Sequence, residues 1–97
     1  MILRLEYAPR YFRRLEDVYE WIARDTPAAA QRTVARIRAA VERLAATPGL
    51  GRPGRVAGTR ELVVTGTPYI VAYRTTDEAV QVITVLHGAR KWPDHLT

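Results

Sequence analysis

The chain has 97 residues, 47% of them hydrophobic and 26% charged, which suits one globular domain over residues 1–97 and is too short for two. It contains no cysteine, which excludes disulfides and thiolate metal sites, and its two histidines give no reason to expect a metal or another cofactor. The first residues carry no signal-peptide pattern and no apolar run is long enough to cross a bilayer, so we expect a cytoplasmic protein without a membrane partner.

Charge is the most informative part of the composition. Fifteen Lys and Arg residues against ten Asp and Glu residues give a net charge of +5, and the pI is about 10.2. Lys91 is the only lysine, so guanidinium groups carry nearly all of the positive charge, and their planar donors suit phosphate and carboxylate. The charge indicates a nucleic acid or an acidic protein as partner, although a solvated, arginine-rich surface explains it equally well.

The first part of the chain predicts a strand followed by a helix. Residues 2–7 alternate in polarity, with Leu3, Leu5 and Tyr7 on one face of a short strand. From about residue 9 to residue 24 the hydrophobic period becomes helical. The apolar stripe of this helix consists of Phe12, Leu15, Val18, Tyr19 and Ile22, with Trp21 beside it.

A second helix follows at once and predicts a helical hairpin. Thr26 is a suitable N-cap, and Pro27 suits the first helical position. We expect the helix to run to about Ala46. Its narrow apolar stripe, which suits packing against the first helix, consists of Ala30, Val34, Ile37, Val41 and Leu44. Off this stripe lies a basic face that consists of Arg32, Arg36, Arg38 and Arg43. Such a face either binds a partner or, more commonly, is solvated.

The second half predicts three strands after a Gly- and Pro-rich basic loop. We expect strands at residues 59–64, 68–75 and 80–87, which short connections make antiparallel neighbours. In the last strand we expect one face to carry Val80, Val82, Thr84 and Leu86 and the other to carry Gln81, Ile83, Val85 and His87. The predicted fold class is α+β, with the order β-α-α-β-β-β and a helical hairpin on a small, mostly antiparallel sheet.

Several segments carry a family resemblance through their order and spacing. They are residues 17–22 (DVYEWI) and 27–30 (PAAA) in the hairpin, 51–54 (GRPG) and 58–62 (GTREL) at the entry to the sheet, and 68–74 (PYIVAYR) and 85–90 (VLHGAR) in the last two strands. Together they resemble the RelE/ParE superfamily of toxins from bacterial type II toxin–antitoxin modules, over almost the whole chain. No single motif among them is decisive.

The resemblance implies a growth-inhibiting toxin that is held inactive in a hetero-oligomer by a cognate antitoxin. It also implies one of two targets: DNA gyrase, inhibited by binding, or ribosome-bound mRNA, cleaved by a metal-independent endoribonuclease. We expect an acidic or amphipathic antitoxin segment to cover apolar surface on the helical hairpin or at the sheet edge and to mask the arginines. The residues expected to contact it are Tyr19, Ile22, Val34 and Arg38.

For RNA cleavage the chain must supply a base, an acid and cations around the phosphate. His87 is the best titratable candidate, and Arg60 and Arg90 are candidates to share its site. The alternative is that His87 packs at a strand end and that the cations bind the antitoxin.

One departure from the nuclease pattern favours gyrase binding. The nuclease branch commonly has an arginine where this chain has Pro68 and Tyr69, and often a tyrosine in its basic tail, where this chain has residues 90–93 (RKWP). In the gyrase-binding mode the expected target-binding residues are Arg74, Tyr73, Lys91 and Trp92. A third hypothesis, a basic nucleic-acid-binding module without toxicity, stays open beside these two.

Overall fold

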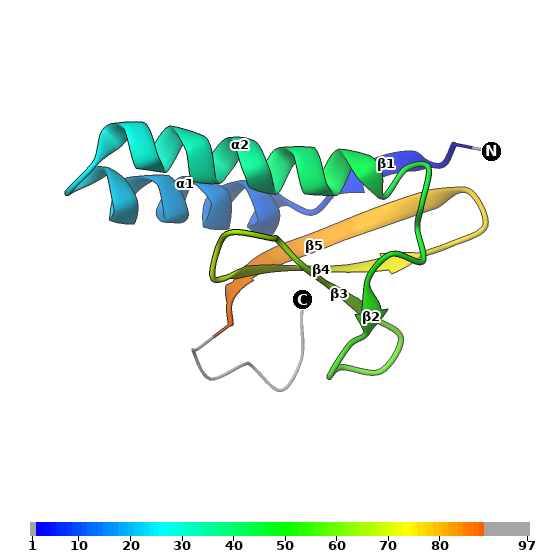
Figure 1. Ribbon diagram of the computed structural model, residues 1–97. Helices are drawn as coiled ribbons and strands as arrows, with labels where there is room; N and C mark the ends of the chain where they lie inside the picture. The colour runs from blue at the N-terminus through cyan, green and yellow to red at the C-terminus, as the bar shows by residue number, and fades with distance from the viewer. Residues whose placement is uncertain (1, 89–97) are drawn as a thin grey trace.

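The computed structural model describes residues 2–88, in which two helices lie over one face of a five-stranded sheet (Figure 1). The elements are β1 (Arg4–Tyr7), α1 (Pro9–Ala23), α2 (Pro27–Arg43), β2 (Arg52–Pro53), β3 (Arg60–Val63), β4 (Tyr69–Thr75) and β5 (Ala79–His87). The predicted α+β class and helical hairpin are confirmed. The short strand β2, which the basic loop forms before β3, was not predicted from the sequence.

The strands are ordered β1-β5-β4-β3-β2, so the first and last strands within residues 2–88 are neighbours. β2, β3, β4 and β5 pair antiparallel, whereas β1 pairs parallel to β5. A parallel neighbour needs a long crossover, and the helical hairpin occupies part of the chain between these two strands. The sheet is therefore mostly antiparallel with one parallel edge.

The hairpin packs on the sheet through a core that both helices share, but the stripe of α1 differs from the prediction. Tyr11 is 2% exposed and belongs to the core, whereas Phe12 is 54% exposed. Successive helical residues point about 100° apart, so only one of this pair can face the sheet. Phe12 instead packs beside Tyr7 and Tyr11, with ring centroids 5.3 Å from each. Its assignment to the core stripe was wrong.

Helix α2 starts with Pro27 after Thr26, as the sequence predicted, and its stripe is largely confirmed. The side chain of Thr26 makes no capping hydrogen bond, so the residue holds the N-cap position by its extended backbone alone. The helix ends at Arg43, three residues before the expected end. Its fully buried residues are Ala30, Ile37 and Val41, followed by the C-cap Leu44.

A β-bulge reverses the faces of β5 partway along its length. Ala72 pairs with Thr84 while the next residue, Tyr73, pairs with Val82, so β5 has one extra residue at this point. Because side chains alternate with period 2, the extra residue exchanges the two faces. Val82 and Val85, which the alternation places on opposite faces, both join the core under the helices. The predicted strict alternation was therefore wrong beyond the bulge.

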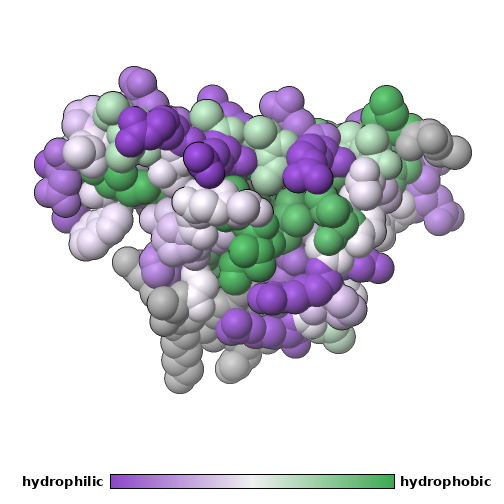
Figure 2. Space-filling view, in the orientation of Figure 1, coloured by the Kyte–Doolittle hydropathy of each residue, from purple (hydrophilic) through white to green (hydrophobic). Residues whose placement is uncertain are grey.

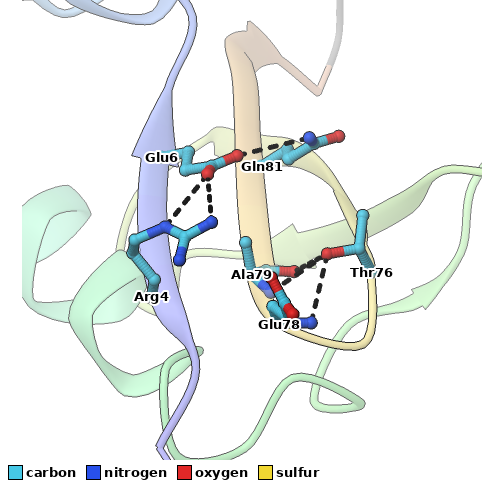
Figure 3. A network of polar contacts seen from close by, with 6 residues as sticks. All are labelled: Arg4, Glu6, Thr76, Glu78, Ala79 and Gln81. Atoms are coloured by element: carbon cyan, nitrogen blue, oxygen red, sulfur yellow. Dashed lines mark hydrogen bonds and ion pairs between the residues drawn. The ribbon is translucent and has the colours of Figure 1, made fainter.

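Polar side chains tie β1 to β5 on the face away from the helices (Figure 3). Glu6 on β1 accepts hydrogen bonds from Arg4 Nε at 3.0 Å and Nη2 at 2.8 Å, and from Gln81 Nε2 at 3.3 Å. The hydrogen bond from Arg4, followed by that from Gln81, holds the pKa of Glu6 below its ordinary value. Beside it, the hydroxyl of Thr76 accepts the backbone N–H groups of the β4–β5 turn.

The surface of the molecule is strongly polar over the helices. Figure 2 shows hydrophilic residues along the hairpin and a hydrophobic patch where the hairpin meets the sheet. Neither helix within residues 2–88 combines the length and apolar character that spanning a membrane would require.

Candidate functional surface

The loop between α2 and β3 is folded around the hydroxyl of Tyr73 on β4. This side chain is 0% exposed. Its hydroxyl donates to the carbonyl of Pro48 at 2.8 Å and accepts from the N–H of Gly51 at 2.8 Å. Burial raises the pKa of Tyr73, so the hydroxyl stays protonated and able to donate. Tyr73 was expected to touch the target, but the structure places it inside the core, where it cannot form part of an exposed surface.

A buried carboxylate fixes the next part of this loop. Glu61 on β3 is 2% exposed. It accepts the backbone N–H of Arg55 at 2.7 Å and the guanidinium Nη2 of Arg52 on β2 at 3.2 Å. A buried carboxylate is costly without such partners, so these contacts hold the basic loop against the sheet. The sequence analysis missed this role. The sequence did contain a signal for it: a single acidic residue within a strand, where the preceding loop carries two arginines.

Arg60 and His87, two of the proposed catalytic residues, are not brought together. Arg60 on β3 lies opposite Tyr73, whereas His87 on β5 lies opposite Tyr69. These positions are four residues apart on β4, which is about 13 Å along the strand, and they lie on opposite sides of that strand. The guanidinium of Arg60 also donates from Nη1 to the carbonyl of Gly51 at 2.8 Å. Arg60 thus serves as an anchor of the loop.

His87 packs against an aromatic ring at the end of β5. Its ring centroid lies 5.4 Å from that of Tyr69, in an edge-on arrangement with an interplanar angle of 85°. This position agrees with the packing alternative from the sequence. The third proposed catalytic residue, Arg90, lies outside the described residues, so a site made from His87 and Arg90 stays a prediction.

Arg74 is the described member of the proposed target-binding set that reaches solvent. It is exposed near the end of β4 and lies opposite Gln81, on the side of the sheet away from the helices. Lys91 and Trp92 lie outside the described residues. Within residues 2–88, no three His, Asp or Glu side chains are grouped as a metal site would require.

The four residues expected to contact an antitoxin differ in how far they are exposed. Tyr19 is 36% exposed, and Arg38 is exposed as well. Ile22 and Val34 are only partly buried and pack against the edge of the core. The two helices therefore offer an apolar surface that is incompletely covered, with a cation beside it. Whether an antitoxin uses these residues stays a prediction.

Two exposed aromatic residues of α1 were not assigned a binding role from the sequence. Phe12 is 54% exposed and Trp21 is 58% exposed. The Cζ atom of Arg24 lies 5.1 Å from the centroid of the Trp21 ring. The sequence placed Trp21 beside the apolar stripe rather than on it. That position was the one indication in the sequence that Trp21 reaches the surface.

Comparison with known proteins places this architecture in a family. The family model described as the ParE toxin of the type II toxin–antitoxin system parDE matches residues 5–92. A protein of Sinorhizobium fredii named "Putative toxin Y4kP" is 45% identical over 93 residues, covering 96% of both chains. The "Toxin RelE2" of Caulobacter vibrioides is 37% identical over 76 residues, covering 78% of this chain and 84% of its own.

Solved structures show the same fold at lower sequence identity. A chain of the chromosomal ParDE system from P. aeruginosa has a TM-score of 0.79 at 24% identity, covering 89% of this chain and 96% of its own. A chain of the RelBE2 complex from Mycobacterium tuberculosis has a TM-score of 0.69 at 23% identity, covering 93% and 95%.

The family model and the 45% identical relative show a toxin of the RelE/ParE superfamily, as the sequence resemblance implied, and the solved structures share its fold. The chain belongs to the ParE toxin family of type II toxin–antitoxin systems.

Proposed function

We propose that the protein inhibits growth by binding DNA gyrase, without breaking a bond in its target. The main support is the strand register, which sets Arg60 opposite Tyr73 and His87 opposite Tyr69. A nuclease site that uses both Arg60 and His87 has to bring them to one phosphate. Here Arg60 instead holds the carbonyl of Gly51. An inhibitor that only binds its target, without catalysing a reaction, needs no such catalytic set.

The proposed contacts with gyrase are Arg74, on the outer face of the sheet, together with Lys91 and Trp92. Arg74 is exposed there, and Lys91 and Trp92 follow β5 in the chain. A guanidinium and an indole are the side chains most often found where a protein interface is tightest. Action on gyrase also means that the protein works in the cytoplasm.

The test is a supercoiling assay with purified gyrase, relaxed plasmid and the purified chain. We expect inhibition by the wild type, a weaker effect of Arg74→Glu, and no change for the control Arg32→Glu on the exposed side of α2. Wild-type supercoiling at saturating concentrations of the chain would overturn the proposal.

The second candidate is a ribosome-dependent mRNA endonuclease that uses His87, Arg60 and Arg90. The observation in its favour is the 37% identity to a relative named Toxin RelE2. Primer extension on translated messages after induction separates the two functions. New 5′ ends that disappear with His87→Ala would support the nuclease, and their absence would exclude it. Unimpaired growth during expression alone would instead favour the third hypothesis, a basic module without toxicity.

We also propose that a cognate antitoxin neutralises the toxin by covering the hairpin at Tyr19, Ile22, Val34 and Arg38. The partly covered apolar side chains and the adjacent guanidinium suit an acidic amphipathic segment. Coexpression with the product of the neighbouring gene is expected to give a complex that survives high salt. Arg38→Glu is expected to weaken this complex, whereas Asp77→Ala in the β4–β5 turn serves as a control. A chain that stays alone in coexpression would contradict the proposal.

A further inference from the structure

The outward surface of α1 carries its charges in two separate blocks. The six charged residues of residues 10–20 line one hollow on this surface, namely Arg10, Arg13, Arg14, Glu16, Asp17 and Glu20. All three cations precede Leu15 in the sequence, and all three acids follow it. Leu15 itself is buried on the opposite side of the helix, which keeps the hollow on the outside of the hairpin.

The order of the two blocks is unfavourable for the dipole of the helix that carries them, although Arg13 and Asp17, four residues apart, are a favourable pair of opposite charges. The first turn of α1 contains no acid and its last turn no base, so the charges oppose the preferences that the helix dipole sets. Arg10 and Arg14 are like charges four residues apart, as are Glu16 and Glu20, and such pairs are destabilising. Within the described residues, one ion pair joins the two blocks: Arg14 Nη1 lies 3.8 Å from Asp17 Oδ2, between two largely exposed side chains.

The same arrangement is complementary to itself when a second copy runs in the opposite direction. Arg10, Arg13, Asp17 and Glu20 are spaced three, four and three residues apart, which is the spacing of residues along a seam between packed helices. If two α1 helices pack antiparallel with Leu15 level with Leu15, position 10 lies opposite position 20 and position 13 opposite position 17. Each pair of facing positions, which we call a layer, then joins a guanidinium of one copy to a carboxylate of the other. The two-fold symmetry makes each layer occur twice.

An exposed aromatic residue lies beside this seam. Trp21 is 58% exposed and follows Glu20 directly. In the antiparallel arrangement it lies level with Pro9 of the second copy, at the start of that copy's helix. Tryptophan and arginine are enriched where interfaces are buried, so this position supplies apolar area that the charged layers lack.

We propose that the protein forms a two-fold symmetric dimer through the outward surface of α1. The occupant of the surface is a second copy of this chain, because a charge pattern that reverses sign about its own midpoint matches itself. The ion pairs of the seam join surface side chains that salt can screen, so the dimer is weak and salt-dependent. It does not depend on the gyrase proposal.

Sedimentation equilibrium of the purified full chain at about 50 mM and about 500 mM salt tests this, since screening is much stronger at the higher ionic strength. We expect a dimer at low salt that dissociates at high salt. Arg13→Glu and Asp17→Arg each place like charges opposite one another twice per dimer and are expected to weaken it on the order of thirtyfold. The control is Arg32→Glu on α2, which leaves the dimer intact.

Mixing the two variants gives the decisive result. In a heterodimer of Arg13→Glu with Asp17→Arg, each layer again pairs opposite charges, so two weakly associating proteins are expected to dimerise when combined. Association of the mixture identifies the antiparallel seam, because a variant that merely misfolds cannot be rescued by the other. A wild type that stays monomeric at low salt, a dimer unaffected by either reversal, or a mixture that stays monomeric would each overturn the proposal.

Discussion

Replacing Tyr73 by Phe removes one buried oxygen and nothing else from the core. The hydroxyl makes two hydrogen bonds of 2.8 Å, to Pro48 and from Gly51. Each bond contributes roughly 1 kcal/mol, and the buried N–H left without a partner at Gly51 adds a further penalty of similar size. We therefore expect the free energy of unfolding to fall by about 3 kcal/mol, which lowers Tm by about 15 °C in a domain of this size.

Urea denaturation followed by tryptophan fluorescence measures this loss, and hydrogen exchange of the Gly51 amide reports the loop directly. The matched control is Tyr19→Phe, which removes a hydroxyl at a 36%-exposed position of α1. That change is expected to alter stability by less than about 0.5 kcal/mol. Wild-type stability of Tyr73→Phe would refute the assigned anchoring role. Growth inhibition lost at unchanged stability would show that the hydroxyl acts in function through the position of the loop rather than in stability.

Three further changes probe the loop, a turn and the core. Glu61→Gln removes the charge that faces Arg52 and is expected to lower the free energy of unfolding by roughly 2 kcal/mol. Urea denaturation measures this change, and an unchanged free energy would show that the ion pair contributes nothing to stability. Gly66 has φ +81, so Gly66→Ala is expected to cost roughly 1–2 kcal/mol, whereas Gly49→Ala, with open space around it, is expected to lower Tm far less. Burial raises the pKa of Tyr11 to about 12. Because this exceeds the unfolded value of about 10, the contribution of Tyr11 to stability is complete below about pH 10 and is lost as the pH rises toward 12. Urea midpoints measured over that range are expected to fall, and midpoints that stay constant would contradict the expectation.

The local pattern of the sequence was sufficient for the elements. Hydrophobic periods of 3.6 and 2 residues and the turn residues around Pro27 depend on neighbours in the chain, so the hairpin and the later strands were predicted close to their observed bounds. The two errors in facing residues, at Phe12 and beyond Val82, have a shared cause. Each depends on a rotation or a register shift of one residue, and only packing against another element selects it.

The candidate site was less predictable for the same reason. Sequence analysis selected Arg60, Tyr73 and His87 for their chemistry, and side-chain chemistry does not reveal which strand positions face one another. Pairing across β4 sets Arg60 and His87 at different levels of the sheet and turns Tyr73 into the core. The role of Glu61 was hidden too, because its partners become neighbours only when β2 pairs with β3.

The sequence by itself indicated the family through its resemblance to known toxins, and it determined the α+β class and the excess of arginine through hydrophobic period, the order of segments and composition. The tertiary structure alone decided which polar groups are buried as anchors and which charges remain on the outside of α1. That division depends on contacts between residues distant in the chain, whose free energies are gained only when the sheet and the hairpin have closed on each other.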